Sequence, residues 1–210
     1  LMKLLIVGAS RGIGKVLLEE ALKEDHQVRV LARHPEKIEA AGGRLEIVEG
    51  DVRDPEGLRA AALDMEVICS CIGVPITFKP VDLFSTAATN LVFVAEQQPG
   101  LKLIAVTGIG AGDSKGHGGF LYDRIFKPLF LKTIYQDKDR EEALIRASKT
   151  DWLIVRPAGL TNGPRTGNYR VVTDLEGTVA TRISRLDVAD YILSQMVHPT
   201  QFGETPLITY

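Results

Sequence analysis

The opening of the chain constrains the fold most, because an apolar run breaks into glycines and then resumes with helical periodicity. Leu4 to Val7 predict a short buried strand, and the apolar positions from Val16 to Leu22 recur at the spacing of a helix. Gly8, Gly12 and Gly14 lie in the turn between them. A helix that begins at such a turn leaves free backbone N–H groups and the positive end of its dipole at one point, where a pyrophosphate can bind. Glycine suits this turn because a Cβ would keep a phosphate away from the backbone or block the turn.

The spacing of this turn is Gly-x-x-x-Gly-x-Gly, and strand, turn and helix follow in the order that a nucleotide site requires. An ordinary strand-to-helix turn is the alternative, since 20 glycines in 210 residues produce clusters by chance. The turn lies where the first strand of an α/β nucleotide-binding fold ends, and this position favours the nucleotide site.

Apolar strand-like runs alternate with helical patterns along the chain, which predicts an α/β fold. Strands are expected near residues 3–8, 27–32, 44–49, 66–71, 101–107, 152–156 and 205–209. Helices are expected over 12–24, 55–63, 82–97, 133–148 and 186–196, with a short one near 35–41. We expect one domain over residues 2–210, with a doubly wound, mostly parallel sheet in a three-layer α/β/α arrangement. Loops 108–132 and 157–182 follow strands and are expected to form the substrate pocket.

Composition narrows the classes of function. The 25 basic and 27 acidic residues give a net charge of −2, which predicts no binding to nucleic acid or to a membrane surface. No apolar run is long enough for a membrane helix and no secretory signal opens the chain, so a cytoplasmic protein is expected. Cys69 and Cys71 lie in an apolar strand and are interpreted as small core residues, a disulfide or a metal site being the alternative. We expect no metal, a small-molecule substrate, and a monomer or homodimer.

Several segments resemble a known family. Gly8-Ala-Ser-Arg-Gly-Ile-Gly14 resembles the nucleotide turn of the short-chain dehydrogenase/reductase superfamily. Arg156-Pro157-Ala158-Gly159-Leu160 is similar to a turn of its atypical and extended members. Asp187-Val188-Ala189 resembles a further signature, although Asp187 is alternatively a helix cap. The chain is thus similar to the atypical branch, which has an NAD(P)-binding Rossmann-like fold and includes NmrA-like proteins and flavin and biliverdin reductases.

The resemblance implies where a dinucleotide binds. The glycine turn would hold the pyrophosphate, while later segments would lie along the adenine, the central riboses and the nicotinamide. The residues implied, in chain order, are Gly8, Ser10, Arg11, Gly12, Ile13, Gly14, Asp51, Val52, Cys71, Ile72, Gly73, Pro157, Ala158 and Leu160. Asp51 is alternatively the cap of the helix after Pro55, a role for which Asp54 is better placed.

The end of the second strand bears on the choice of nucleotide. Proteins that prefer NAD usually carry a carboxylate there, whereas this chain has Arg33 and His34, with no acidic residue before Glu36. Arg11 is expected to reach the same corner, and two guanidinium groups suit a 2′-phosphate. The sequence therefore predicts NADP (NADPH) as cofactor, with solvated surface arginines as the alternative.

Active relatives carry a Tyr-x-x-x-Lys pair on the fifth helix and a Ser or Thr at the end of the preceding strand. Thr107 and Lys138 match that pattern, but the tyrosine position holds Ile134, and Tyr135 gives Tyr-x-x-Lys instead. The resemblance implies catalytic roles for Thr107, Tyr135 and Lys138. Lys138 alternatively bonds only the nicotinamide ribose, or is a solvated helix lysine.

The apolar run from Phe120 to Leu131 is interpreted as a pocket lining, with packing as the alternative. His117 and Tyr122 are further candidate proton donors. Together these features predict an NADPH-dependent oxidoreductase that passes hydride to a flavin, a quinone or another small conjugated carbonyl compound. The chain is too short for the sugar-nucleotide domain of the extended epimerases. The alternative function is a non-catalytic NADP(H)-binding sensor or scaffold like the NmrA-type regulators.

Overall fold

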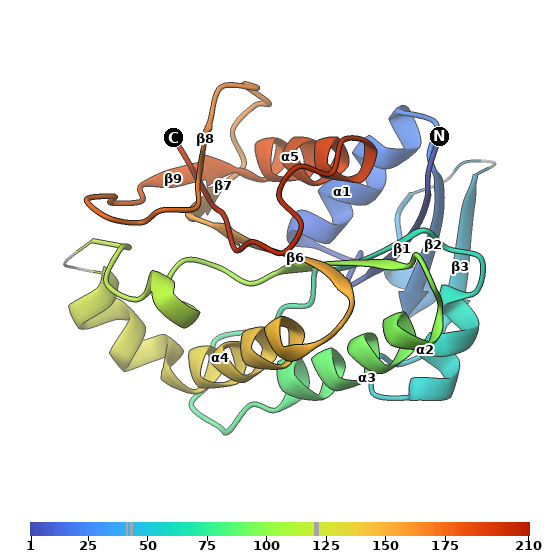
Figure 1. Ribbon diagram of the computed structural model, residues 1–210, viewed down its shortest axis with the longest axis horizontal. Helices are drawn as coiled ribbons and strands as arrows, with labels where there is room; N and C mark the ends of the chain where they lie inside the picture. Colours follow the sequence, from blue (N-terminus) through green and yellow to red (C-terminus); the bar gives the residue numbers. More distant parts are fainter. Residues whose placement is uncertain (41, 43, 120–121) are drawn as a thin grey trace.

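A mostly parallel sheet of eight strands forms the middle of the computed structural model, which describes residues 1–40, 42, 44–119 and 122–210 (Figure 1). The strand order is β3-β2-β1-β4-β5-β6-β10-β8, and only the pair β10–β8 is antiparallel. The strands are β1 (Lys3–Val7), β2 (Gln27–Ala32), β3 (Leu45–Glu49), β4 (Val67–Ser70), β5 (Lys102–Val106), β6 (Asp151–Pro157), β8 (Arg170–Val172) and β10 (Leu207–Thr209). The predicted fold class is confirmed.

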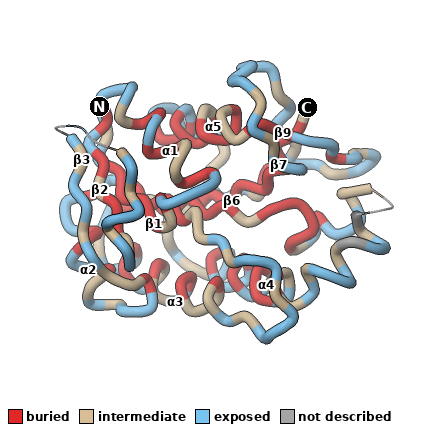
Figure 2. The backbone as a smooth tube through the Cα atoms, turned by 180° about the vertical axis from the view of Figure 1, so that it is seen from behind, coloured by how far each residue is buried: buried red, intermediate tan, exposed pale blue. Residues whose placement is uncertain are grey.

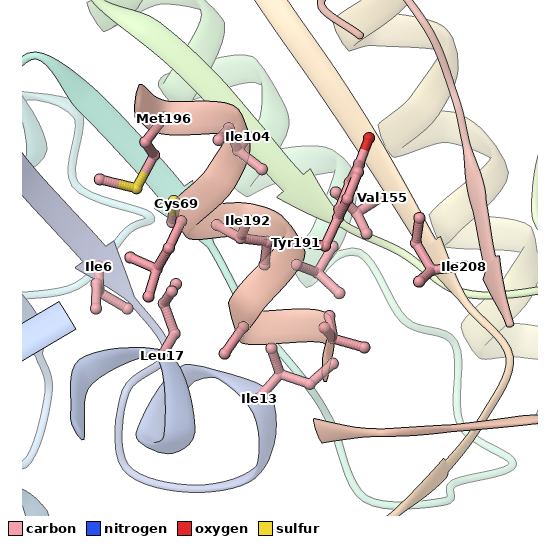
Figure 3. Close-up of a cluster of buried hydrophobic side chains, with 14 of the residues drawn as sticks. Ile6, Ile13, Leu17, Cys69, Ile104, Val155, Tyr191, Ile192, Met196 and Ile208 are labelled. Carbon is pink, nitrogen blue, oxygen red and sulfur yellow. The ribbon is translucent and has the colours of Figure 1, made fainter. Parts of the chain in front are cut away.

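Two layers of helices cover the sheet. Figure 1 shows α1 (Gly12–Lys23) and α5 (Arg185–Val197) on one face, and α2 (Pro55–Ala62), α3 (Leu83–Gln97) and α4 (Lys132–Ala147) on the other. Both faces of each central strand are therefore buried, and the strands read as continuous apolar runs. The sheet divides the core in two, one half packing against α1 and α5 (Figure 3) and the other against α2 and α3.

Alternate side chains of β1 illustrate this division. Leu4 and Ile6 face the half beside α1, whereas Leu5 and Val7 face the other half. Buried residues accordingly run along β1 and β6 in Figure 2, while exposed ones lie at the periphery. Cys69 is a buried core residue, as predicted, but Cys71 is only half-buried, and both thiols are free.

The predicted strands and long helices are all present, with ends that differ by only one or two residues. The expected helix near 35–41 is only a 3₁₀ turn, η1 (Pro35–Lys37). The parallel pair β7 (Gly159–Thr161) and β9 (Arg182–Ser184) and the strand β8 were not predicted. Three-residue strands are too short to show an apolar alternation, which explains the omission.

The loop after β5 also contains unpredicted helical segments. A 3₁₀ turn, η2 (Gly112–Ser114), is followed by a ten-residue π-helical segment, η3 (Tyr122–Leu131), that continues into α4 (Figure 1). Phe120 and Leu121, the first members of the predicted pocket lining, lie outside the described residues. Ile125 and Leu129 are exposed, so packing within the described chain does not account for them, and packing against a second subunit stays an alternative. No described helix is long and apolar enough to cross a membrane.

Candidate nucleotide and acceptor site

The three glycines of the first turn have different reasons to be glycine. Gly8 has φ +92°, and a Cβ there would lie 2.6 Å from the carbonyl oxygen of Cys71. A Cβ on Gly14 would lie 2.1 Å from the carbonyl oxygen of Gly8. Gly12 has φ +62°, but nothing lies within 4 Å of the position of its Cβ. Gly8 and Gly14 thus permit the close packing of the turn, whereas Gly12 borders open space.

That open space adjoins the amino terminus of α1. Its N-cap, Arg11, makes no side-chain capping bond, and the first turn contains no acidic residue. The first backbone N–H groups of a helix have no partner within the helix, so their positive potential remains available to an anion. Ser10 and Arg11 are exposed beside it, while Ile13 is buried and anchors the turn to the core. The turn therefore fits the pyrophosphate of a dinucleotide.

The two arginines predicted to bind a 2′-phosphate lie beside the ends of different strands. Arg33 and His34 are exposed after β2, and among the described residues the Arg33 guanidinium forms no ion pair. Nη2 of Arg11 instead donates to the carbonyl of Gly73 at 3.4 Å, in the loop after β4. Since β2 and β4 lie on opposite sides of β1, the structure does not bring the two guanidinium groups together. Arg33 and His34 alone occupy the predicted corner.

The segments predicted for the adenine and the riboses lie on the same edge of the sheet. Asp51 follows β3, and its carboxylate accepts a bond from the backbone N–H of Arg53 at 2.9 Å. Asp54 caps α2 by accepting from the N–H of Glu56, so the alternative that Asp51 is the cap is wrong. Val52 is buried beside them. Cys71 to Gly73 pass directly beside Gly8, as the resemblance implies.

Lys138 is buried in the core of the predicted catalytic region. Its Nζ lies 3.7 Å from Oε2 of Glu141 and 4.1 Å from the ring centroid of Phe84. The alternative of a solvated helix lysine is therefore wrong. Burial raises the pKa of the Cys71 thiol to about 12, and the charge of the nearby Lys138 offsets part of that rise. Cys71 in turn packs against Gly8 of the glycine turn.

Tyr135 lies at the end of β5. Its hydroxyl is 3.1 Å from the position that a Cβ on Gly108 would take, and Nζ of Lys127 is 4.8 Å from its ring centroid. Ile134, at the position of the family tyrosine, is buried in the protein. Tyr135 follows Ile134 directly on α4 and therefore points about 100° away from the direction of the family tyrosine. The ring of Tyr135 is contacted by Lys127, whereas Lys138 contacts Glu141 and Phe84.

Thr107 belongs to a buried polar network that the sequence did not reveal. Its hydroxyl donates to Oε1 of Glu142 at 2.7 Å. Arg156 donates from Nε to the same oxygen at 3.0 Å and from Nη2 to Oε2 at 2.6 Å, and its third nitrogen pairs with Asp113. Burial disfavours the charged guanidinium, but the bonds to Glu142 outweigh it and raise the pKa of Arg156. The Thr107 hydrogen is engaged, so this hydroxyl can only accept a bond from a ligand.

Two neighbours of Lys138 on α4 are also buried. Oε2 of Glu141 has no hydrogen-bond partner in the described part of the chain, and burial raises the pKa of this carboxyl to about 7. Asp137 accepts from the backbone N–H of Phe84 at 2.8 Å and of Ser85 at 3.3 Å, and so caps α3 from a neighbouring helix. The only advance signal for these roles is their spacing of three or four positions along α4.

Backbone groups of the turn after β6 form hydrogen bonds within the protein. The backbone N–H of Ala158 donates to the carbonyl of Ile208 at 3.0 Å, and the carbonyl of Pro157 accepts from the N–H of Ile109 at 3.0 Å. These two groups are therefore occupied by the protein. Leu160 lies in β7 and is exposed toward solvent. Nδ1 of His117 bonds the carbonyl of Thr178 at 2.9 Å, and the side chain of Tyr122 lies outside what the structure describes.

Asp187 is not the cap of α5. Ser184 caps that helix, accepting from the backbone N–H of Asp187 at 3.0 Å. The Asp187 carboxylate accepts from the N–H groups of Thr166 and Gly167 and from the hydroxyl of Tyr210, at 2.8, 2.9 and 2.6 Å. Burial would raise the pKa of this carboxyl, but these bonds outweigh it and lower the pKa to about 2. Asp187 therefore connects the loop at Thr166 and Gly167 to Tyr210, the last residue.

A groove of about 590 Å³ lies beside Tyr135, between the loop after β5, η3 and α4, and we call it the α4 groove. The aromatic ring of Tyr135 and the ring of Pro128 belong to its wall. Its charged lining consists of Lys115, Asp123, Arg124, Lys127, Lys132 and Asp139. Among the described residues, no group of three or more His, Cys, Asp or Glu side chains is gathered as a metal site would require.

The fold and the first turn define an NAD(P)-binding protein of the Rossmann-like class. The chain belongs to the NAD(P)H-binding family, whose model matches residues 8–199. The predicted similarity to atypical short-chain reductases and NmrA-like proteins is thereby confirmed, and a nicotinamide cofactor with it.

Three known proteins illustrate the relationship. YhfK of Bacillus subtilis, named an uncharacterized sugar epimerase, is 28% identical over 205 residues, 93% of this chain and 88% of that protein. The uncharacterized chloroplastic protein At2g34460 of Arabidopsis thaliana is 31% identical over 186 residues, 84% of this chain and 65% of that protein. The anaerobillin reductase ChuY of Escherichia coli O157:H7 shares the fold, with a TM-score of 0.81, 24% identity, and coverage of 98% and 96% of the two chains.

Proposed function

We propose that the protein is an NADPH-dependent reductase that acts on a small conjugated acceptor, such as a flavin, a quinone or another carbonyl compound. The observation that carries this proposal is the combination of an uncapped helix start at the glycine turn with a buried lysine, Lys138, on α4. A turn that can bind a pyrophosphate and a cation that can bind a ribose would together orient a nicotinamide cofactor for hydride transfer. The name of ChuY, a reductase of the same fold, agrees with this proposal.

The chain's own residues would hold the cofactor at several points. The N–H groups at Gly12 and Ile13 would bind the pyrophosphate, Arg33 the 2′-phosphate, and Lys138 the nicotinamide ribose. Bound NADPH supplies a hydride, two electrons with one hydrogen, and the acceptor takes one proton in addition. Lys138 is buried against the Phe84 ring, and exclusion of water there would strengthen its electrostatic interaction with a ligand.

Tyr135 is the proposed proton donor, because its hydroxyl lies at the end of β5. The substitution Tyr135→Phe is expected to lower turnover by about 10²-fold while NADPH affinity is retained. Unchanged turnover would mean that solvent supplies the proton and that the protein acts by orienting the acceptor.

A second function, a sensor that binds NADP(H) without chemistry, is favoured by two observations. The tyrosine position of the active family members is filled by the buried Ile134, and the Thr107 hydrogen is bonded to Glu142. Such a protein would bind NADPH tightly and turn nothing over.

Absorbance decay of NADPH with a panel of flavins, quinones and aldehydes tests the two functions against each other. Oxidation of NADPH with any of these acceptors supports the reductase. Tight NADPH binding by calorimetry without oxidation supports the sensor. If neither NADPH nor NADH binds to the protein, both proposed functions are contradicted.

A further inference from the structure

We infer that the α4 groove binds the acceptor through an anionic group, so that the preferred acceptor is a planar conjugated compound carrying a carboxylate. The inference rests on the proposed reductase function, since it assigns the acceptor of that reaction. It follows from the charge, the lining and the location of the groove.

The charge of the groove is positive although the whole chain carries −2. Four basic and two acidic side chains line it, and both acidic ones bind groups of the protein, although Oδ1 of Asp123 has no hydrogen-bond partner among the described residues. Asp139 pairs with Lys115 at 2.6 Å, and Asp123 accepts from the backbone N–H of Gly118 at 2.8 Å. Arg124, Lys127 and Lys132 are left, and none of them forms an ion pair with a described carboxylate. The groove therefore holds uncompensated cations, which an anionic ligand complements.

Lys127 is the best placed of these cations. Its side chain is half-buried, its Nζ donates to the carbonyl of Gly110, and it lies over the ring of Tyr135. Burial lowers the pKa of this ammonium. A carboxylate beside it would favour the charged form, because a nearby opposite charge offsets desolvation. The fixed position of Lys127 also reduces the entropy lost when it binds a ligand.

The location links the groove to the reacting end of the site. Tyr135 forms part of the groove wall, and its hydroxyl reaches Gly108, the residue after Thr107. The rings of Tyr135 and Pro128 offer contact to a planar ring system, and basic side chains belong to the same lining. An acceptor whose ring lies on Tyr135 and whose carboxylate meets Lys127 would extend from the groove toward the end of β5.

The test compares an anthraquinone carboxylate with the matched anthraquinone carboxamide, which differs in charge but hardly in shape. Calorimetry in the presence of NADP⁺ measures binding without turnover, and NADPH absorbance decay measures turnover separately. We expect the carboxylate to bind about tenfold more tightly than the amide, the scale of one charge-assisted bond. Lys127→Met should abolish this preference, and Lys127→Arg should retain it. Lys149→Met, an exposed residue after the end of α4 and outside the lining of the groove, is the matched control and should behave as the wild type.

The outcomes separate this inference from the proposed function. Equal affinity for the two compounds, or a preference that survives Lys127→Met in a folded variant, overturns the inference even if both compounds are reduced. A preference lost in Lys127→Met supports the groove even if neither compound is reduced, in which case the reductase proposal fails alone. If Lys127→Met does not fold, Lys127→Gln replaces it, with the same interpretation of each outcome.

Discussion

Glu141 and Glu142 are adjacent on α4 and both buried, yet their electrostatic situations are opposite. Glu142 receives two bonds from Arg156 and one from Thr107. Among the described residues Glu141 forms an ion pair with Lys138 alone, at 3.7 Å, and one of its oxygens has no hydrogen-bond partner. A buried carboxylate is stable when it is paired and hydrogen-bonded, and costly when it is not.

Glu141→Gln is therefore expected to stabilise the protein at alkaline pH. The pKa of this carboxyl is about 7 in the folded protein against an ordinary value of 4.5. Between pH 4.5 and pH 7 the Glu141 carboxyl is protonated in the folded state and ionised in the unfolded state. The free energy of unfolding therefore falls as the pH rises, and this fall is complete above pH 7. Glutamine does not ionise. We expect a gain on the order of 2 kcal/mol near pH 8 that disappears near pH 5, measured by urea unfolding.

The neighbouring substitution Glu142→Gln serves as the matched comparison. It leaves Arg156 buried without its main partner, and should destabilise the protein by about 3–5 kcal/mol. Equal effects of the two glutamine variants at alkaline pH would contradict the assigned difference between the carboxyls.

Arg33 decides the proposed preference for NADPH. If its guanidinium binds the 2′-phosphate, Arg33→Ala should weaken NADPH binding by about 1.5–3 kcal/mol, the scale of a charge-assisted contact, and leave NADH binding unchanged. Calorimetry with both nucleotides measures this difference. Lys37→Ala, in the neighbouring turn η1, is the control for a general loss of positive charge. Equal losses for NADPH and NADH would remove Arg33 from the site.

At the scale of elements, two glycines at the junction of β1 and α1 are expected to differ in role, Gly8 serving stability and Gly12 nucleotide binding. Gly8→Ala places a Cβ 2.6 Å from the carbonyl oxygen of Cys71, whereas Gly12→Ala places one in open space. Gly8→Ala should lower the free energy of unfolding by roughly 2–4 kcal/mol, from overlap and left-handed strain together. Gly12→Ala should lower it by about 1 kcal/mol from strain alone, yet weaken nucleotide binding at least about tenfold.

Denaturant unfolding and nucleotide titration on the two alanine variants measure these effects. A Gly12→Ala protein that binds NADPH as the wild type does would show that the turn does not hold the pyrophosphate.

The long elements were predictable because their signals are local. The strands of the central sheet are buried on both faces, so runs such as Leu4 to Val7 stand out, and the long helices show clear apolar periodicity. The pair β7–β9 and the segment η3 were not predictable in this way. The two strands have three residues each, and Pro128 interrupts the helical pattern of η3.

The candidate site was predictable at the glycine turn and poorly so on α4. The stretch from Asp137 to Glu142 is entirely charged, and such a run is typical of a solvated helix face. In the structure Asp137, Lys138, Glu141 and Glu142 are buried. Their partners, among them Phe84 and Arg156, come from distant parts of the chain. Only the tertiary fold brings these groups together, so no local pattern reveals them.

At the scale of the whole molecule, Asp187 joins the end of the chain to the loop after β7. Asp187→Asn should destabilise the protein by about 2 kcal/mol at neutral pH, since the pKa of this carboxyl falls from 3.8 to about 2 on folding. The lowered pKa of Asp187 stabilises the folded protein above pH 3.8, and this stabilisation is lost as the pH falls through 2. Thermal unfolding of the wild type and Asp187→Asn should therefore converge near pH 2.

Tyr210→Phe removes one of the bonds to Asp187 and should cause a smaller loss, about 1 kcal/mol. A loss in Asp187→Asn that does not change with pH would contradict the role of its charge.

The cap that Asp137 supplies to α3 also bears on the order of folding. The residue at the start of α3, Asp82, makes no capping bond of its own, and the carboxylate that binds the Phe84 N–H comes 53 positions later in the chain. During synthesis the first turn of α3 therefore stays frayed until α4 has left the ribosome. The two helices then consolidate as a pair, and a nascent chain that stops before α4 lacks an ordered start to α3.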